Sequence, residues 1–317
     1  MKTILSILLF IPLASFSCDH CNVLLNVPPN DFRNSVDLMF RSRDMFGSYN
    51  AFGEMITTRH ADHGNDLALW GNDVSETYRT MELRGNFYFF DKWRTTIIIP
   101  YVFNTQNIDD AVRYRVNAVG DPVLLQSYLI YNSMGDTAKQ VFTQRWIVGA
   151  GLRAPLGETQ LSYDNGTPNL DLQPGSGAWG ALVYTTFTFK YKWLGWRNNI
   201  SFLHNGQDNL YYQYGQTFNW NSNLFADIPI GKQTLRLLGG IYHESAKMDK
   251  TRSVGSEPGL IHNNTGGKIW FAQTGIRIFT KNMQFFGTYE HAVKCNLNGF
   301  EQLLTRNTFN LGATWYF

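Results

Sequence analysis

The sequence is poor in charged residues. Asp, Glu, Lys and Arg make up 16% of its 317 residues, well below the roughly 25% of an average soluble domain. The two signs nearly cancel and leave a formal net charge of +2. A balance this small gives no electrostatic reason to expect nucleic acid as a partner, and none is predicted.

Long apolar runs are also missing beyond the N-terminus. After residue 18 no stretch of about 18 apolar residues occurs, so no transmembrane helix is expected. The mean hydropathy is −0.26 although aromatic residues reach 15%. Few charges, many aromatics and average hydropathy together indicate apolar residues that alternate with polar ones. Such a chain would enter a membrane only as strands.

One short apolar run opens the chain, in MKTILSILLFIPLASFSC. Lys2 supplies a basic region, residues 4–13 form the apolar core, and serines stand one and three positions before Cys18. This order predicts a cleavable secretory signal peptide over 1–17. The alternative is a lipoprotein in which Cys18 is acylated, although that reading expects a Leu-like residue where Ser15 stands.

From residue 35 to the end, apolar and polar residues alternate with a period of two, the pattern of strands with one apolar face. The last nine residues, FNLGATWYF, show it over their whole length. Twelve such segments are predicted, at 35–46, 77–90, 93–104, 121–131, 141–153, 179–191, 196–204, 218–226, 233–243, 268–279, 283–291 and 305–317. Tilted strands of about 9–11 residues cross the apolar layer of a bilayer, and these segments have about that length.

The connections between these segments alternate between short and long. The short ones lie at 90–93, 133–139, 192–195, 229–232 and 281–282. The long, polar ones lie at 47–76, 105–119, 154–177, 205–214, 245–266 and 292–304. Short turns at one end and long loops at the other are typical of an outer-membrane β-barrel. A soluble β-sandwich, the alternative, does not predict this order.

The predicted fold class is therefore all-β, a transmembrane antiparallel up-and-down β-barrel of about twelve strands. The barrel would cover 35–317, preceded by an N-terminal periplasmic segment at 18–34. Its location would be the bacterial outer membrane, with lipid around it. Trp315 and Phe317 end the last strand, and this aromatic ending resembles the C-terminal signal that outer-membrane barrels present to the barrel assembly machinery.

Three stretches in the middle of the chain resemble a known family. Gly120-Asp121-Pro122 opens VGDPVLLQSYLIYN, residues 149–158 read GAGLRAPLGE, and residues 172–180 read LQPGSGAWG. This order is similar to the outer-membrane barrel family named for the phenol-degradation meta-pathway (MetA-type), often described as transporters. There a Gly-Asp strand start, a Gly-x-Lys-x-Pro-Thr-Gly strand end and a Pro-Gly-Gly/Ser-Gly strand start follow one another. Arg153 stands here for the Lys and Leu156 for the Thr.

The resemblance covers residues 115–317. It implies a barrel porin or transporter for small molecules, hydrophobic or aromatic ones among them. The family name carries little information on the substrate, so the resemblance bears more on the fold than on the function.

The function is expected to depend on the polar residues that alternate with the apolar ones and face the inside of the barrel. The predicted solute path is lined by Glu82, Arg84, Arg145, Lys190, Asn219, Asn221, Asn223, Arg236, Arg277 and Glu290. Paired charges among them would satisfy one another in a closed interior, whereas an open lumen with a basic excess would favour anions or polar solutes. A twelve-stranded barrel lies between filled and wide barrels, so its radius does not decide between the two. The predicted function is a porin-like transporter for a small solute.

An alternative function is metal handling through the segment CDHC at 18–21. Cys18, His20 and Cys21 can hold a soft metal ion such as copper, and the two thiols can instead close a disulfide in the oxidising envelope. The third cysteine, Cys295, is predicted to lie in an outer loop. A second stretch, RHADHGND at 59–66, carries two histidines three residues apart, but such residues are more often solvated turns.

No catalytic set stands out, and no enzymatic activity is predicted. Ser201 and His204 lie three apart on one predicted strand, so their side chains would point to opposite faces. No cofactor is expected apart from the metal ion considered for 18–21. A structural or adhesive barrel that acts through its long loops is a third reading.

Deleting Phe317 should lower the amount of assembled barrel, because the last strand would lose the aromatic residue that ends the proposed assembly signal. The measurement is the level of heat-modifiable protein in isolated outer membranes. A Phe317→Tyr variant keeps an aromatic end and serves as the control. Wild-type levels in the deletion variant would refute the signal.

Overall fold

A computed structural model describes residues 33–49, 55–56, 73–90, 92–133, 141–163, 170–252, 259–299 and 302–317. The long strands are β1 (Ser35–Tyr49), β3 (Asp73–Phe90), β4 (Trp93–Ile108), β6 (Val123–Asn132), β7 (Phe142–Arg153), β8 (Gly180–Tyr191), β9 (Leu194–Asn205), β11 (Thr217–Ile230), β12 (Gln233–Ala246), β15 (Gly267–Phe279), β16 (Met283–Leu297) and β17 (Leu304–Tyr316). The short elements are β2 (Met55–Ile56), β5 (Ala111–Val119), the 3₁₀ turn η4 (Leu170–Leu172), β10 (Tyr212–Gln213), β13 (Asp249–Thr251) and β14 (Leu260–His262).

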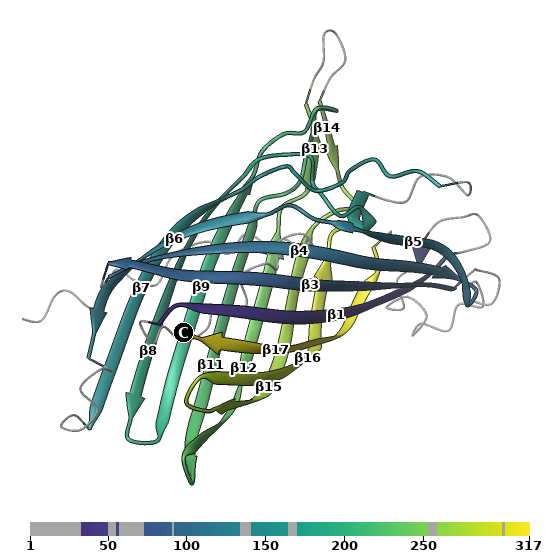
Figure 1. The fold of residues 1–317 in the computed structure, drawn as a ribbon. Helices are drawn as coiled ribbons and strands as arrows, with labels where there is room; N and C mark the ends of the chain where they lie inside the picture. The colour runs from purple at the N-terminus through teal and green to yellow at the C-terminus, as the bar shows by residue number, and fades with distance from the viewer. Residues whose placement is uncertain are drawn as a thin grey trace, which may run out of the picture.

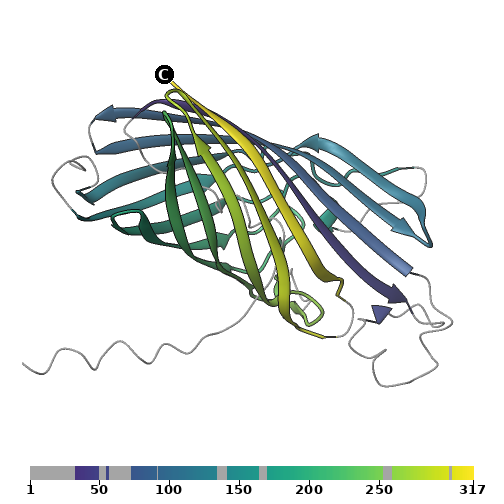
Figure 2. The same ribbon diagram turned by 90° about the horizontal axis from the view of Figure 1, so that it is seen from below.

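The long strands form one antiparallel sheet that closes on itself. Each strand pairs with the next along the chain, and β17 pairs with β1 from Tyr316 opposite Ser35 to Leu304 opposite Phe46. Figure 1 shows the strands crossing obliquely side by side, and Figure 2 shows the yellow last strand beside the purple first one. The prediction of a twelve-stranded antiparallel barrel is confirmed. No helix among the described residues is long and apolar enough to cross a membrane.

The two faces of the wall differ as the alternation predicts. On β3 and β4 the side chains of Leu83 and Ile99 are 50% and 45% exposed on the outside, whereas Glu82 and Arg84 are 2% exposed on the inside. An apolar outer face suits hydrocarbon, which offers no partner for a polar group. Charged side chains such as these two therefore lie inside the barrel.

The prediction of a long loop at 105–119 is wrong. Strand β4 continues to Ile108, turns at Asp109 and Asp110, and returns as β5. Both turn residues have positive φ, 49° and 61°, which fits the tight hairpins in which Asp and Asn are favoured. Because β5 and β6 both pair with β4, they form one barrel strand that is interrupted at residues 120–122.

The last long connection is shorter than predicted. Strand β16 reaches Leu297 and β17 begins at Leu304, so much of the predicted loop 292–304 is strand. Cys295 lies within β16 and not in an outer loop, and its thiol lies 3.8 Å from the carbonyl oxygen of Thr305. The turns at 192–193, 231–232 and 280–282 are short as expected, and they mark what we call the short-turn end of the barrel.

Both described ends of the chain lie at this short-turn end. The backbone N–H of Phe317 donates to the carbonyl oxygen of Asn34 at 3.0 Å. The guanidinium of Arg33 donates to the carbonyl oxygen of Lys281 at 2.8 Å. Trp315 and Phe317 are 55% and 52% exposed on the outside of the wall. Their position fits aromatic residues at a membrane boundary.

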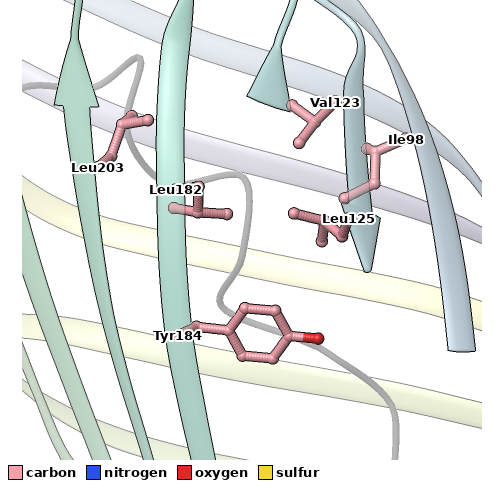
Figure 3. Packing of buried hydrophobic residues seen from close by; sticks show 6 residues of the cluster. All are labelled: Ile98, Val123, Leu125, Leu182, Tyr184 and Leu203. Atoms are coloured by element: carbon pink, nitrogen blue, oxygen red, sulfur yellow. The ribbon is translucent and has the colours of Figure 1, made fainter. Parts of the chain in front are cut away.

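Part of the inner wall is apolar. Six buried side chains from β4, β6, β8 and β9 converge there, as Figure 3 shows: Ile98, Val123, Leu125, Leu182, Tyr184 and Leu203. At the edge of this cluster, the Tyr184 hydroxyl lies 2.5 Å from the Ser127 hydroxyl. Arg94 donates a hydrogen bond to the same Tyr184 hydroxyl at 3.4 Å. The interior on this side is therefore packed like a protein core.

A small sheet of β10, β13 and β14 extends the opposite, long-connection end. Asp249 of β13 contacts β10 and the chain beyond it: its carboxylate accepts hydrogen bonds from the Tyr212 hydroxyl at 2.5 Å and from the backbone N–H of Gly215 at 2.6 Å. Burial raises the pKa of Asp249 above its ordinary value, although these hydrogen bonds act in the other direction. Burial, followed by the nearby Asp249 charge, raises the pKa of Tyr212.

Candidate functional site

The interior of the barrel is the candidate site, and all the residues predicted to line it face inward. Seven are buried: Glu82, Arg84, Arg145, Asn219, Asn221, Arg277 and Glu290. Lys190, Asn223 and Arg236 are half-buried at inward positions. Seven of these ten residues fall into three groups, and the structure does not unite the ten in one site. Their role as a solute path stays a prediction.

The first group centres on Asp227, which sequence reasoning missed as a lumen residue. Its carboxylate lies 2.6 Å from the Lys190 ammonium and 2.6 Å from the Arg236 Nε. Arg236 also lies over the ring of Phe225, at 4.0 Å from the ring centroid. Two cations sharing one carboxylate, and a guanidinium on an aromatic face, hold these side chains in place.

The second group is a chain of amides that ends on a carboxylate. Asn221 donates to the side-chain oxygen of Gln273 at 3.0 Å, and Gln273 donates to Glu290 at 2.7 Å. Asn223 donates in turn to Asn221. The chain joins β11, β15 and β16 along the inner wall.

The third group is an ion pair within one strand. The guanidinium of Arg84 donates to the carboxylate of Glu82 through Nε at 2.8 Å. Both side chains are fully buried, so each charge is satisfied by the other. Arg145 lies apart from all three groups, where its Nε donates to Asn132 at 3.0 Å.

A further ion pair crosses the interior, and it was not predicted. The Arg43 guanidinium of β1 donates to both carboxylate oxygens of Glu244 on β12, at 2.9 Å each. Strands β15, β16 and β17 separate β1 from β12 around the wall, so the two side chains meet across the lumen. Tyr242 donates to the same carboxylate at 2.7 Å, and Arg43 also donates to Thr308 at 3.2 Å.

These residues were missed for identifiable reasons. Arg43 follows the period-two pattern of 35–46, which could have placed it inside. Arg197, which lines an interior cavity together with Asn199, was missed in the same way, because it lies two positions before Asn199 in the predicted strand 196–204. Glu244 lies one residue beyond the predicted end of its strand at 243, so the pattern did not reach it.

The three motifs of the family resemblance meet at one buried side chain, Asp121. Its Oδ1 accepts from the Gly157 N–H at 2.9 Å, and its Oδ2 accepts from the N–H and the hydroxyl of Ser176 at 2.8 and 2.6 Å. Arg153 Nε lies 3.6 Å from Oδ2. The connection between β7 and β8 is thus fixed to the break between β5 and β6.

Glycines let the backbones approach at this point. A Cβ at Gly157 would lie 2.6 Å from the carbonyl carbon of Gly120, and one at Gly175 would lie 2.7 Å from Gly157. Such contacts are too short for any side chain, which gives the glycines of all three motifs a steric reason.

Beyond this point the connection turns into the barrel. Leu172 of η4 is fully buried and packs against Tyr78, Tyr114 and Val116 on the inner face of β3 and β5. Asn104 donates to the carbonyl oxygen of Leu172 at 3.0 Å. We call the described residues 154–163 and 170–179 the inward loop. It narrows the lumen from one wall and leaves a cavity beside Arg41 and Glu82.

The residues considered for metal binding lie outside the described part of the chain. This applies to Cys18, His20 and Cys21 and to the stretch 59–66. Among the residues that the structure describes, no group of three or more His, Cys, Asp or Glu side chains could hold a metal ion. The predicted signal peptide at 1–17 and periplasmic segment at 18–34 also lie almost entirely outside the described residues, and both stay predictions.

Ser201 and His204 do not form a nucleophile–base pair. Ser201 is buried on the inner face of β9, and His204 is exposed on the outer face. The His204 ring instead lies 2.9 Å from the amide of Gln216. The prediction that they point to opposite faces is confirmed.

No family model matches the chain, and no curated protein is similar to it in sequence. Among solved structures, an outer-membrane channel from Pseudomonas putida F1 is similar with a TM-score of 0.64 at 10% identity, over 92% of this chain and 100% of that one. The two share a fold. The β-domain of the Bordetella autotransporter BrkA has a TM-score of 0.43 at 8% identity, over 90% of this chain and 99% of that one. The transport unit of the Escherichia coli autotransporter AIDA-I has a TM-score of 0.43 at 10% identity, over 93% and 95%.

Replacing Arg43 by Met should destabilise the barrel by about 3–5 kcal/mol, because it leaves the Glu244 carboxylate buried without its cation. The double variant Arg43→Met, Glu244→Met should recover most of this loss. The measurement is urea unfolding of the purified barrel in detergent. Arg113→Met, at an exposed position on β5, is the control. A double variant as unstable as the single one would contradict the assignment.

Replacing Asp121 by Asn should loosen the inward loop. The amide keeps one acceptor oxygen and loses the other, together with the ion pair to Arg153, and each hydrogen bond to a charged group contributes about 1.5–3 kcal/mol. Chymotrypsin should then cleave the folded barrel faster after Tyr163. Glu158→Gln changes an exposed carboxylate of the same loop and should leave cleavage unchanged. Equal rates in both variants would show that Asp121 does not hold the loop.

Proposed function

We propose that the protein is an outer-membrane channel that admits a small solute through the barrel lumen and that it has no enzymatic activity. The observation that carries the proposal is the division of the wall into two faces. Its outside is apolar, and its inside carries charged and amide side chains on nearly every strand. A lumen lined by polar side chains would allow polar solutes to cross the membrane.

The fold shared with an outer-membrane channel supports this proposal, and so does the position of the short turns. In outer-membrane barrels the short turns face the periplasm. The short-turn end would then be periplasmic, and both described chain ends would lie there. The assembly machinery would meet Trp315 and Phe317 on the last strand.

The inward loop is consistent with a selective channel rather than a wide pore. It packs on the inner wall through Leu172, and the pair of Arg43 and Glu244 crosses the lumen nearby. These groups reduce the free cross-section, so passage would be limited to small molecules. The meeting of the three motifs at Asp121 supports a common architecture with the transporter family that they resemble.

The purified barrel should give steady conductance steps in a planar bilayer, because its lumen would carry ions past the inward loop. Asp121→Asn should raise the step size if the loop limits the cross-section, and Glu158→Gln should not. Folding is checked by the heat-modifiable gel mobility of each protein. Silence from both the folded wild-type barrel and the folded Asp121→Asn variant would refute the channel.

A further inference from the structure

A lysine occurs in every short connection of the barrel. The five short connections hold one each, at positions 92, 139, 192, 232 and 281, and these are five of the eleven lysines of the sequence. The structure describes four of them, which we call the turn lysines: Lys92, Lys192, Lys232 and Lys281. All four are exposed, and none forms an ion pair with a described carboxylate.

The short connections carry an excess of positive charge. Two aspartates, Asp91 and Asp136, occur in them, so five lysines stand against two carboxylates in the sequence. Both aspartates lie outside the described residues. At the other end of the barrel the hairpin of β4 and β5 is mixed in sign, because the exposed Asp109 and Asp110 precede the exposed Arg113. The positive excess is therefore a property of the short turns.

The backbone at Lys192 gives no local reason for a lysine. In the turn 192–193 the φ of Lys192 is 54°, and in the turn 231–232 the equivalent residue is Gly231, with a φ of 60°. Glycine is the usual residue at positive φ, because a Cβ is unfavourable there. A lysine at this position costs backbone energy, which indicates that its side chain serves a purpose outside the turn.

Aromatic side chains lie directly beside two of the turn lysines. Trp93 follows Lys92, and Lys192 stands between Tyr191 and Trp193. The side chains of Trp93, Tyr191 and Trp193 are 44%, 54% and 55% exposed, and the Lys192 ammonium lies 5.4 Å from the centroid of the Tyr191 ring. Exposed aromatic rings near the strand ends of a barrel mark the boundary between hydrocarbon and headgroups. The adjacent ammonium groups therefore lie at the level of lipid phosphates.

The turn lysines are distributed around the wall rather than gathered on one side. They belong to the hairpins β3–β4, β8–β9, β11–β12 and β15–β16, which contribute eight of the twelve long strands. A globular partner beside the barrel would contact one side of it, whereas lipid surrounds the whole wall. The distribution fits lipid headgroups.

We infer that the turn lysines form a ring of cations that binds the phosphate groups of anionic phospholipids around the short-turn end. An ammonium group can donate up to three hydrogen bonds to phosphate oxygens, and it is attracted to a negatively charged lipid surface. The apolar outer face above the turns would hold the acyl chains. The inference rests on the proposed function only in placing the barrel in a membrane, and it names the lipid class that the barrel selects.

The first test measures lipid preference and needs neither transport nor a known orientation. Native mass spectrometry follows the purified barrel in detergent during titration with phosphatidylglycerol or with phosphatidylcholine of the same acyl chains. The wild type should bind the first phosphatidylglycerol about fivefold more tightly than the first phosphatidylcholine, which is the contribution of one lysine near an anionic surface. Equal binding of the two lipids would overturn the inference.

The variants locate this preference on the barrel. Replacing all four turn lysines by Gln should bring the ratio of the two affinities close to one. The matched control removes four exposed cations outside the short turns, in Arg113→Gln, Arg115→Gln, Lys250→Gln and Lys294→Gln, and should keep the wild-type ratio. An unchanged ratio in the turn variant, or a loss of preference in the control instead, would assign the anionic lipid to another part of the barrel.

A conservative variant separates charge from misfolding. Replacing the four turn lysines by Arg keeps every charge and should keep the preference for phosphatidylglycerol. The heat-modifiable gel mobility of each variant shows that it is folded. A folded Arg variant that binds both lipids equally would contradict an interaction between charges.

The conductance measurement distinguishes this inference from the channel. A barrel that stays silent in a planar bilayer but prefers phosphatidylglycerol through its turn lysines would refute the channel and uphold the ring. Steady conductance from a barrel without lipid preference would uphold the channel and refute the ring.

Discussion

The pairing of β17 with β1 is the contact on which the rest of the structure depends. Hydrocarbon cannot hydrogen-bond to the backbone, so a sheet that spans it must have no open edge. The first and last strands supply that closure along twelve residue pairs. Once the sheet is closed, the period of two assigns each side chain to lipid or to the interior. The low charge content of the sequence and its many outward aromatics follow from this requirement.

Closure also concentrates the charged groups of the strands in a narrow space. In one part of the interior they neutralise each other, as Arg43 does with Glu244 and Arg84 with Glu82. In another part, a cavity beside Arg197 and Arg277, the described lining residues include three arginines and no carboxylate. Apolar side chains such as Leu125 and Leu182 fill a third part. The lumen is therefore a set of chemically different surfaces rather than a uniform water-filled channel.

The sequence allowed the strands and their faces to be predicted because the period of two is a local property. It failed at 105–108, where β4 continues through polar residues without an apolar outer face. It also failed at 292–297, where a register shift interrupts the period of two and Ala292, Cys295 and Leu297 pack against a buried cluster. A strand that extends past the bilayer no longer needs that face, so the pattern fades while the hydrogen bonds continue. Partners across the lumen could not be predicted. Neither Arg43 nor Asp121 carries a local signal that identifies Glu244 or Ser176 as its neighbour.

The pair of Arg43 and Glu244 has a consequence for how the chain is assembled. The two residues are 201 positions apart, and contacts between distant residues form only after the intervening chain has been brought together. Until β12 is in place, Arg43 lacks the Glu244 carboxylate that accepts its two parallel hydrogen bonds. Desolvating that cation early would be costly. The arginine thus disfavours membrane entry by the N-terminal strands alone and couples their burial to the arrival of the second half of the barrel.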